Sequence, residues 1–128
     1  MILRLNMSGD TPIYEQLRNE IVLGIASGKL LPGESLPTVR QMAEDLGINT
    51  MTVNKSYALL KEEGYIEIDR RHGAMVSMVQ RKESTLSAKA LEQLRMIVAE
   101  TVVHQVERAE FEKLCSQFFS EMKDYQDK

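Results

Sequence analysis

The chain opens with a stretch in which apolar residues recur at helical spacing. Every fourth position is apolar along one face, at Ile13, Leu17, Ile21 and Ile25. Such a stripe predicts an amphipathic helix. We expect Thr11 to cap it, Pro12 to be its first residue and Ser27-Gly28 to end it.

The following residues, 29–37, hold two prolines and a glycine, which predicts a turn. We expect the leucines of this turn to dock it to the core: Leu30, Leu31 and Leu36.

Two more amphipathic segments, residues 38–46 and 50–63, are separated by only Gly47-Ile48-Asn49. A connection this short between two helices indicates a helix-turn-helix.

The residues at the ends of these two segments suit helix caps. Thr38 can accept a hydrogen bond from a backbone N–H three residues on, and Gln41 is placed to reach back to the cap. Gly47 suits the left-handed residue that ends a helix. Asn49 or Thr50 can cap the second helix.

The second helix divides into an apolar and a polar face. We expect the apolar side chains to point inward: Val53, Tyr57, Ala58, Leu59 and Leu60. The outward set lies in the first two turns: Thr50, Met51, Thr52, Asn54, Lys55 and Ser56. Short polar side chains at a helix N-terminus can enter the DNA major groove, where the helix dipole favours the anionic backbone. The alternative is a solvated helix start with no partner.

After Gly64 the pattern changes from helical to alternating. Residues 65–69 and 74–79 read as two strands around the basic tip Arg70-Arg71-His72-Gly73. Three helices and a hairpin form a winged helix, so the expected fold is mainly α with a small β-hairpin. Arg70 and Arg71 are suited to lie along phosphates or to enter a minor groove. The alternative is a charged hairpin tip that only adds solubility.

The last 46 residues carry two further apolar stripes that cannot share one straight helix. We expect a first helix, capped by Ser84 or Ser87, and a second helix after a bend within residues 107–110. Two short helices with apolar faces and no sheet cannot bury both faces alone, which favours a homodimer. The expected dimer contacts are Leu94, Ile97, Val98, Phe111, Leu114, Phe118, Phe119 and Met122. An aromatic stripe of this kind is an alternative small-molecule pocket.

Composition restricts the remaining chemistry. The chain has 128 residues and a net charge of −3, and all the excess acid lies after residue 82. A neutral first part can bind DNA through a few local cations, because counterion release depends on local phosphate contacts. The single cysteine fits a reducing compartment. Without a signal peptide or membrane span in the sequence, we expect a cytoplasmic protein with no membrane contact.

Catalytic and metal-binding patterns are lacking in the sequence. His72 and His104 are isolated from each other and from Cys115, so no metal-ligand spacing is present. There is no phosphate-binding glycine loop and no nucleophile elbow. We therefore expect no enzyme activity, no metal and no cofactor.

Residues 11–79 resemble the DNA-binding domain of the GntR family of bacterial transcription regulators. The resemblance lies in IASGKLLPGESLPTVR, LGINTMTVNKSYALL and EGYI. It implies a winged helix that binds double-stranded operator DNA. The expected contacts are Thr38, Arg40, Asn49, Thr50, Thr52, Asn54, Lys55, Tyr57, Arg70, Arg71, His72 and Gly73. The wing departs from the family's Gly-x-Gly tip, since Arg71 stands at the first glycine position.

The short helical tail is similar to that of the YtrA-type subfamily, which the resemblance associates with transporter operons. We therefore expect a DNA-binding domain in residues 1–80 and a helical dimerisation region in residues 83–128. The expected function is a dimeric repressor of its own or a transporter operon. The alternatives are a winged-helix module for protein interaction and a regulator that senses a small molecule.

Overall fold

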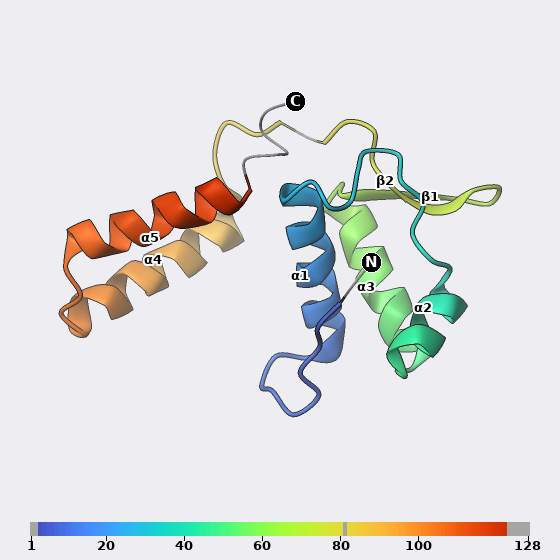
Figure 1. The fold of residues 1–128 in the computed structure, drawn as a ribbon, viewed down its shortest axis with the longest axis horizontal. Coiled ribbons are helices and arrows are strands. Elements are labelled where there is room, and N and C mark those ends of the chain that lie inside the picture. The colour runs from blue at the N-terminus through green and yellow to red at the C-terminus, as the bar shows by residue number, and fades with distance from the viewer. Residues whose placement is uncertain (1–2, 81, 123–128) are drawn as a thin grey trace. The chain divides into compact units, whose positions relative to one another are not determined.

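The computed structural model describes residues 3–80 and 82–122 and divides into two compact units at residue 82. The first unit contains α1 (Ile13–Ala26), α2 (Val39–Leu46), α3 (Thr50–Glu62), β1 (Ile66–Asp69) and β2 (Gly73–Val76). The second contains α4 (Ala88–Val103) and α5 (Arg108–Glu121). Figure 1 shows these elements, and they confirm a mainly helical fold with a small β-hairpin.

The three helices and the hairpin of the first unit share one core. Its fully buried members come from α1, α3 and both strands: Leu17, Ile21, Val53, Leu60, Ile66 and Val76. Each such side chain contributes roughly 1.5–3 kcal/mol by leaving water. Arg18 of α1 also forms a two-pronged ion pair with Glu63, at 2.9 and 3.1 Å, just after α3. These contacts hold α1 against α3, which lies beside it in Figure 1.

The start of α1 differs from the prediction. Pro12, not Thr11, is the capping residue, and the helix begins at Ile13 without a side-chain cap. Pro12 has extended backbone angles, φ −56° and ψ 147°, which places Thr11 one residue too early to cap. Gln16 takes over the role of organising this end. Its side-chain amide donates to the carbonyl oxygens of Thr11 and Asn6 and accepts from the N–H of Asn6.

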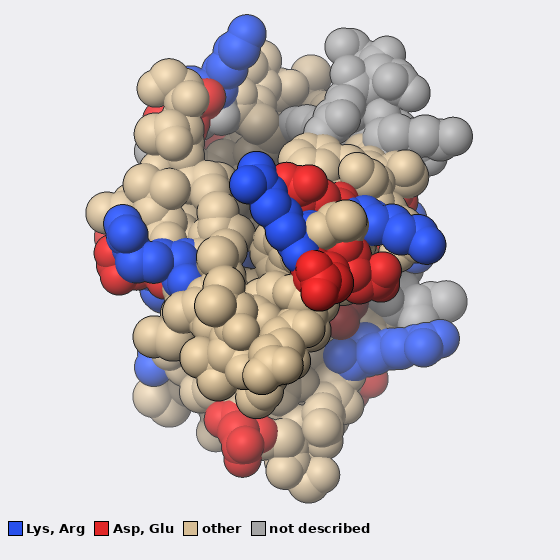
Figure 2. Space-filling model, turned by 90° about the vertical axis from the view of Figure 1, so that its left-hand side faces the viewer, with Lys and Arg blue, Asp and Glu red and all other residues tan. Residues whose placement is uncertain are grey.

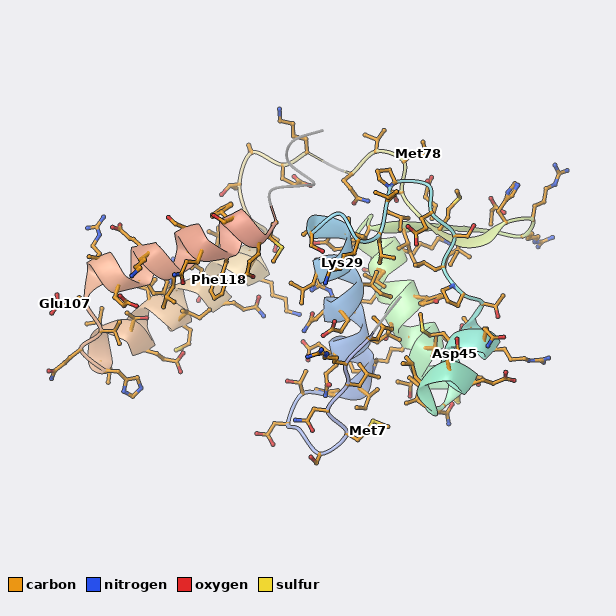
Figure 3. The ribbon with its side chains drawn as sticks, viewed as in Figure 1. Met7, Lys29, Asp45, Met78, Glu107 and Phe118 are labelled. Carbon is orange, nitrogen blue, oxygen red and sulfur yellow. The ribbon has the colours of Figure 1, made fainter. Side chains whose placement is uncertain are left out.

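The hairpin pairs antiparallel, with Ile66 opposite Val76 and Asp69 opposite Gly73. It is shorter than expected, because β2 ends at Val76 and the side chains of Met78 and Val79 are exposed. Met78 is labelled in Figure 3.

The chain before α2 also pairs with β2, which the sequence did not indicate. The N–H of Leu36 donates to the carbonyl of Ala74, and the N–H of Val76 donates to the carbonyl of Glu34. Leu30 and Leu36 are buried as expected, but Leu31 is exposed, which corrects that part of the prediction.

The second unit is a helical pair. Ser87 caps α4 by accepting from the N–H of Ala90 at 3.2 Å. The connection spans residues 104–107, earlier than the expected 107–110, because Gln105 takes a left-handed conformation with φ 57°. No residue of α4 or α5 is buried, and the structure describes both helices completely.

Candidate nucleic-acid interface

The turn between α2 and α3 is built by the side chains expected to cap the helices. The Thr38 hydroxyl accepts from the N–H of Gln41 at 3.1 Å, and Gly47 ends α2 with φ 68°. The Asn49 side chain caps α3 by accepting from the N–H of Met51 at 2.7 Å. One detail is corrected: the Gln41 amide donates to Asp45 at 2.7 Å and does not reach back to the cap.

The N-terminal turns of α3 present polar groups to solvent. Exposed side chains are found at Asn49, Thr50, Met51, Asn54 and Lys55, and Thr52 is half-buried. The carbonyl oxygen of the Asn49 side chain is used by the cap, so its NH₂ group is the part left to donate outward. This end of α3 combines hydrogen-bond donors with the positive end of the helix dipole, which suits a polyanion.

Ser56 does not belong to this surface, contrary to the prediction. Its side chain is fully buried, and its hydroxyl donates to the carbonyl oxygen of Tyr14 in α1. The turn of α3 that bears Ser56 faces α1, and this tertiary contact decides its burial. The prediction for Ala58 was also wrong: it was expected to point inward, but it is exposed. Leu59 is half-buried.

Tyr14 also contacts Lys55. The Lys55 ammonium lies 3.9 Å from the centre of the Tyr14 ring, within the range of a cation–π interaction. Lys55 is exposed, so its charge stays available while the ring restricts where it points. Sequence reasoning did not find this role for Tyr14.

Tyr57 is buried, with 2% of its surface exposed, so the structure corrects the expectation that it contacts DNA directly. Its hydroxyl donates to the carbonyl oxygen of Pro37 at 2.7 Å. Burial raises the pKa of the Tyr57 phenol well above its ordinary value. The residue instead ties α3 to the chain that leads into Thr38 and Arg40, both of which are exposed. The apolar stripe of α3, of which Tyr57 is a member, had already predicted that this side chain points inward.

The hairpin tip is exposed from Arg70 to Gly73. Figure 1 shows the hairpin loop extending past the helices of the first unit, and Figure 3 shows side chains with terminal nitrogens projecting from it. Gly73 has φ 68°, whereas Arg71 is not among the described residues with positive φ. The tip therefore does not need a glycine at position 71.

Asp69 organises this tip, a role that the sequence did not reveal. One of its carboxylate oxygens accepts from the backbone N–H groups of both Arg71 and His72, and the other lies 3.2 Å from the His72 ring nitrogen Nδ1. The hydrogen bonds from the backbone and side chain of His72 hold the pKa of the Asp69 carboxyl below its ordinary value.

Charge on the surface is mixed. On the face shown in Figure 2, basic and acidic side chains intermingle, with wide uncharged areas between them. On this face, therefore, the basic side chains do not gather into one continuous patch.

The described residues contain no group of three or more His, Cys, Asp or Glu side chains arranged for a metal ion. Within the same residues, no helix has both the length and the apolar character needed to cross a bilayer.

Comparison with known proteins adds a family match over half of the chain. The family model described as "Bacterial regulatory proteins, gntR family" matches residues 12–76. The chain is 33% identical over 90 residues to the HTH-type transcriptional regulator Rv1152 of Mycobacterium tuberculosis, a match that covers 70% of this chain and 74% of that protein. It is 36% identical over 76 residues to the HTH-type transcriptional repressor YtrA of Bacillus subtilis, covering 59% of this chain and 58% of that protein.

Solved structures give the same picture. YtrA from Sulfolobus acidocaldarius, a GntR-family transcription factor, aligns with a TM-score of 0.61 and 32% identity, covering 80% of this chain and 99% of that chain. The DNA-binding domain of AraR in complex with operator ORX1 aligns with a TM-score of 0.54 and 26% identity, covering 59% of this chain and 96% of that chain.

Proposed function

The chain belongs to the GntR family of bacterial regulatory proteins and is a transcription regulator with a DNA-binding helix-turn-helix; we propose that it binds its operator as a homodimer and represses its own or a transporter operon. The observation that supports this most is the exposed N-terminal end of α3, with Lys55 held over Tyr14. A repressor role is supported by the similarity to the Bacillus repressor YtrA.

In this proposal α3 is the recognition helix. Its first two turns enter the major groove, where the exposed side chains of Thr50, Asn54 and Lys55 reach base edges or phosphates. The Asn49 NH₂ group and the Thr52 hydroxyl add donors at the same end. Arg40, at the start of α2, contacts the phosphate backbone of the DNA. Arg70 and Arg71 of the wing approach the neighbouring DNA groove.

The homodimer is proposed from the apolar faces of α4 and α5. Between 38% and 64% of the residue surface is exposed at six residues: Leu94, Ile97, Val98, Leu114, Phe118 and Phe119. Phe118 is labelled in Figure 3. Phe111 and Met122 are half-buried between these exposed neighbours. A second copy would cover this surface, and two recognition helices would then meet half-sites about 34 Å apart.

The DNA proposal is tested on a palindromic duplex from the promoter region of the protein's own gene. Arg40→Ala and Thr52→Ala should each weaken binding by about 1–3 kcal/mol, on the order of one lost specific contact. Lys61→Ala is the matched control, because Lys61 is exposed in the last turn of α3, away from the proposed contacts. Fluorescence anisotropy measures all three. Unchanged affinity in both test variants would refute the assignment.

Salt dependence separates this proposal from a winged-helix module for protein interaction. A DNA-binding protein should lose affinity with a log–log slope of about −0.9 per phosphate neutralised. A flat response to salt would favour the interaction module.

The dimer is tested by sedimentation. Val98→Glu places a charge on the apolar stripe of α4 and should give monomers. Met96→Glu is the control: Met96 is also exposed, and it lies about 200° around the helix from Val98 at 3.6 residues per turn. A Val98→Glu protein that stays dimeric would count against this surface.

The remaining alternative, a small-molecule sensor with a pocket at Phe111, Phe118 and Phe119, has its own test. Compounds exported by a neighbouring transporter should raise the melting temperature if they bind the folded chain. No shift across a broad panel would count against a sensor.

A further inference from the structure

The wing tip consists of four consecutive exposed residues, 70–73, and in the proposed function two of them, Arg70 and Arg71, contact DNA. An exposed loop that is disordered before binding loses conformational entropy when it binds. A tip that is ordered before binding avoids that loss.

The atoms that order the tip belong to Asp69. Asp69 is the last residue of β1 and pairs with Gly73, so its backbone is fixed by the hairpin. Its carboxylate then accepts from the Arg71 N–H at 2.8 Å and from the His72 N–H, and approaches the His72 ring at 3.2 Å. A single side chain thus holds both residues that follow Arg70.

We propose that Asp69 is a positioning residue for DNA binding, which preorders the wing tip so that Arg70 and Arg71 meet DNA with their backbone already set. This inference rests on the proposed function. It also explains how the tip keeps its shape with Arg71 at the position where the family carries glycine, because hydrogen bonds to Asp69 define the turn and only Gly73 needs a positive φ.

The proposal runs against simple electrostatics, and this makes it testable. An acidic side chain near DNA repels phosphates, so removal of its charge alone should help binding or leave it unchanged. If ordering is the role of Asp69, removal of its acceptor oxygens should weaken binding instead.

Two substitutions separate charge from hydrogen bonding. Asp69→Asn removes the charge and keeps an acceptor oxygen for the two N–H groups, so its affinity should equal or exceed that of the wild type. Asp69→Ala removes both the charge and the acceptor oxygens and should bind roughly tenfold more weakly, on the order of the cost of ordering one backbone residue. Glu67→Ala is the matched control, since it removes an exposed carboxylate from the same strand without a role in the tip.

The affinities are measured by fluorescence anisotropy on two probes, a 40-base-pair duplex of random sequence and the duplex that the wild type selects from a random library. The Asp69→Ala protein should also show a shallower salt slope, by up to about 0.9 for each arginine that no longer meets a phosphate. Wild-type affinity in Asp69→Ala, or an equal loss in Asp69→Asn and Asp69→Ala, would overturn the proposal.

Amide hydrogen exchange on the DNA-free protein provides a readout that does not depend on DNA. The N–H groups of Arg71 and His72 should exchange faster in Asp69→Ala than in Asp69→Asn or Glu67→Ala. Unchanged exchange in Asp69→Ala would overturn the ordering role even if DNA binding is intact. A wild type that enriches no sequence from the library and does not bind the random-sequence duplex would overturn the proposed function, and the DNA role of Asp69 with it, whatever the exchange rates.

Discussion

The hydroxyl of Tyr57 in α3 donates a 2.7 Å hydrogen bond to the carbonyl oxygen of Pro37, the residue before the cap of α2. This bond joins α3 to the segment that carries Arg40. Because Tyr57 is buried, water cannot replace Pro37 as its partner without opening the core. The spacing between the two proposed DNA-contacting segments is thus fixed from inside the unit.

Tyr57→Phe removes this hydrogen bond and keeps the ring. The carbonyl of the half-buried Pro37 loses this partner, so we expect the free energy of unfolding to fall by about 1 kcal/mol at pH 7. Urea denaturation followed by circular dichroism measures it. A midpoint equal to that of the wild type would show that the bond does not stabilise the unit.

The same residue predicts a difference at alkaline pH. Burial raises the pKa of Tyr57 in the folded protein, whereas in the unfolded chain the phenol titrates near its ordinary value of about 10. The stabilising contribution of the protonated phenol is therefore complete below pH ~10 and is lost as pH rises above it, because the unfolded state then binds fewer protons than the folded state. Between pH 9 and 11, on the order of one unit either side of that pKa, wild-type stability should fall more steeply than that of Tyr57→Phe. Parallel curves would contradict this.

Ser56→Ala tests the contact between α3 and α1. The substitution removes the buried hydroxyl that donates to the backbone carbonyl oxygen of Tyr14. We expect the free energy of unfolding to fall by about 1 kcal/mol. Ser120→Ala is the matched control, since the Ser120 hydroxyl donates to the carbonyl of Ser116 within an exposed helix. Its unfolding should be unchanged. Equal effects of the two substitutions would refute a special role for Ser56.

Gln105→Gly should stabilise the connection between α4 and α5. Gln105 has φ 57°, a conformation that costs a residue with a Cβ atom more than it costs glycine. Relief of this strain outweighs the greater freedom of glycine in the unfolded chain, for a net gain of about 0.5–1 kcal/mol. Gln93→Gly, inside α4, should instead lose about 1 kcal/mol. Thermal melts at one fixed protein concentration measure both, because association adds to apparent stability. A lower melting temperature for Gln105→Gly would contradict the strain.

Much of the fold could be predicted from local sequence signals. The stripe from Ile13 to Ile25 predicted α1, and Gly47 and Asn49 marked the turn between α2 and α3. Apolar periodicity, caps and left-handed glycines act within a few residues, so the sequence carries them directly. The contact roles proposed for Arg40 and for the start of α3 also came from the sequence, and they stay predictions.

The tertiary structure decided the roles that depend on residues far apart in the chain. Ser56 is buried because it meets Tyr14, 42 residues earlier, and Tyr57 is satisfied by Pro37, 20 residues earlier. Neither partner can be inferred from helical spacing, since that spacing says which face is apolar and not what lies against it. At the wing, alternation predicted the strands, but only the folded hairpin places the Asp69 carboxylate beside the N–H groups of Arg71 and His72. The sequence by itself therefore determined which elements form, and packing between distant segments decided which side chains are buried, which are held and which remain free to contact DNA.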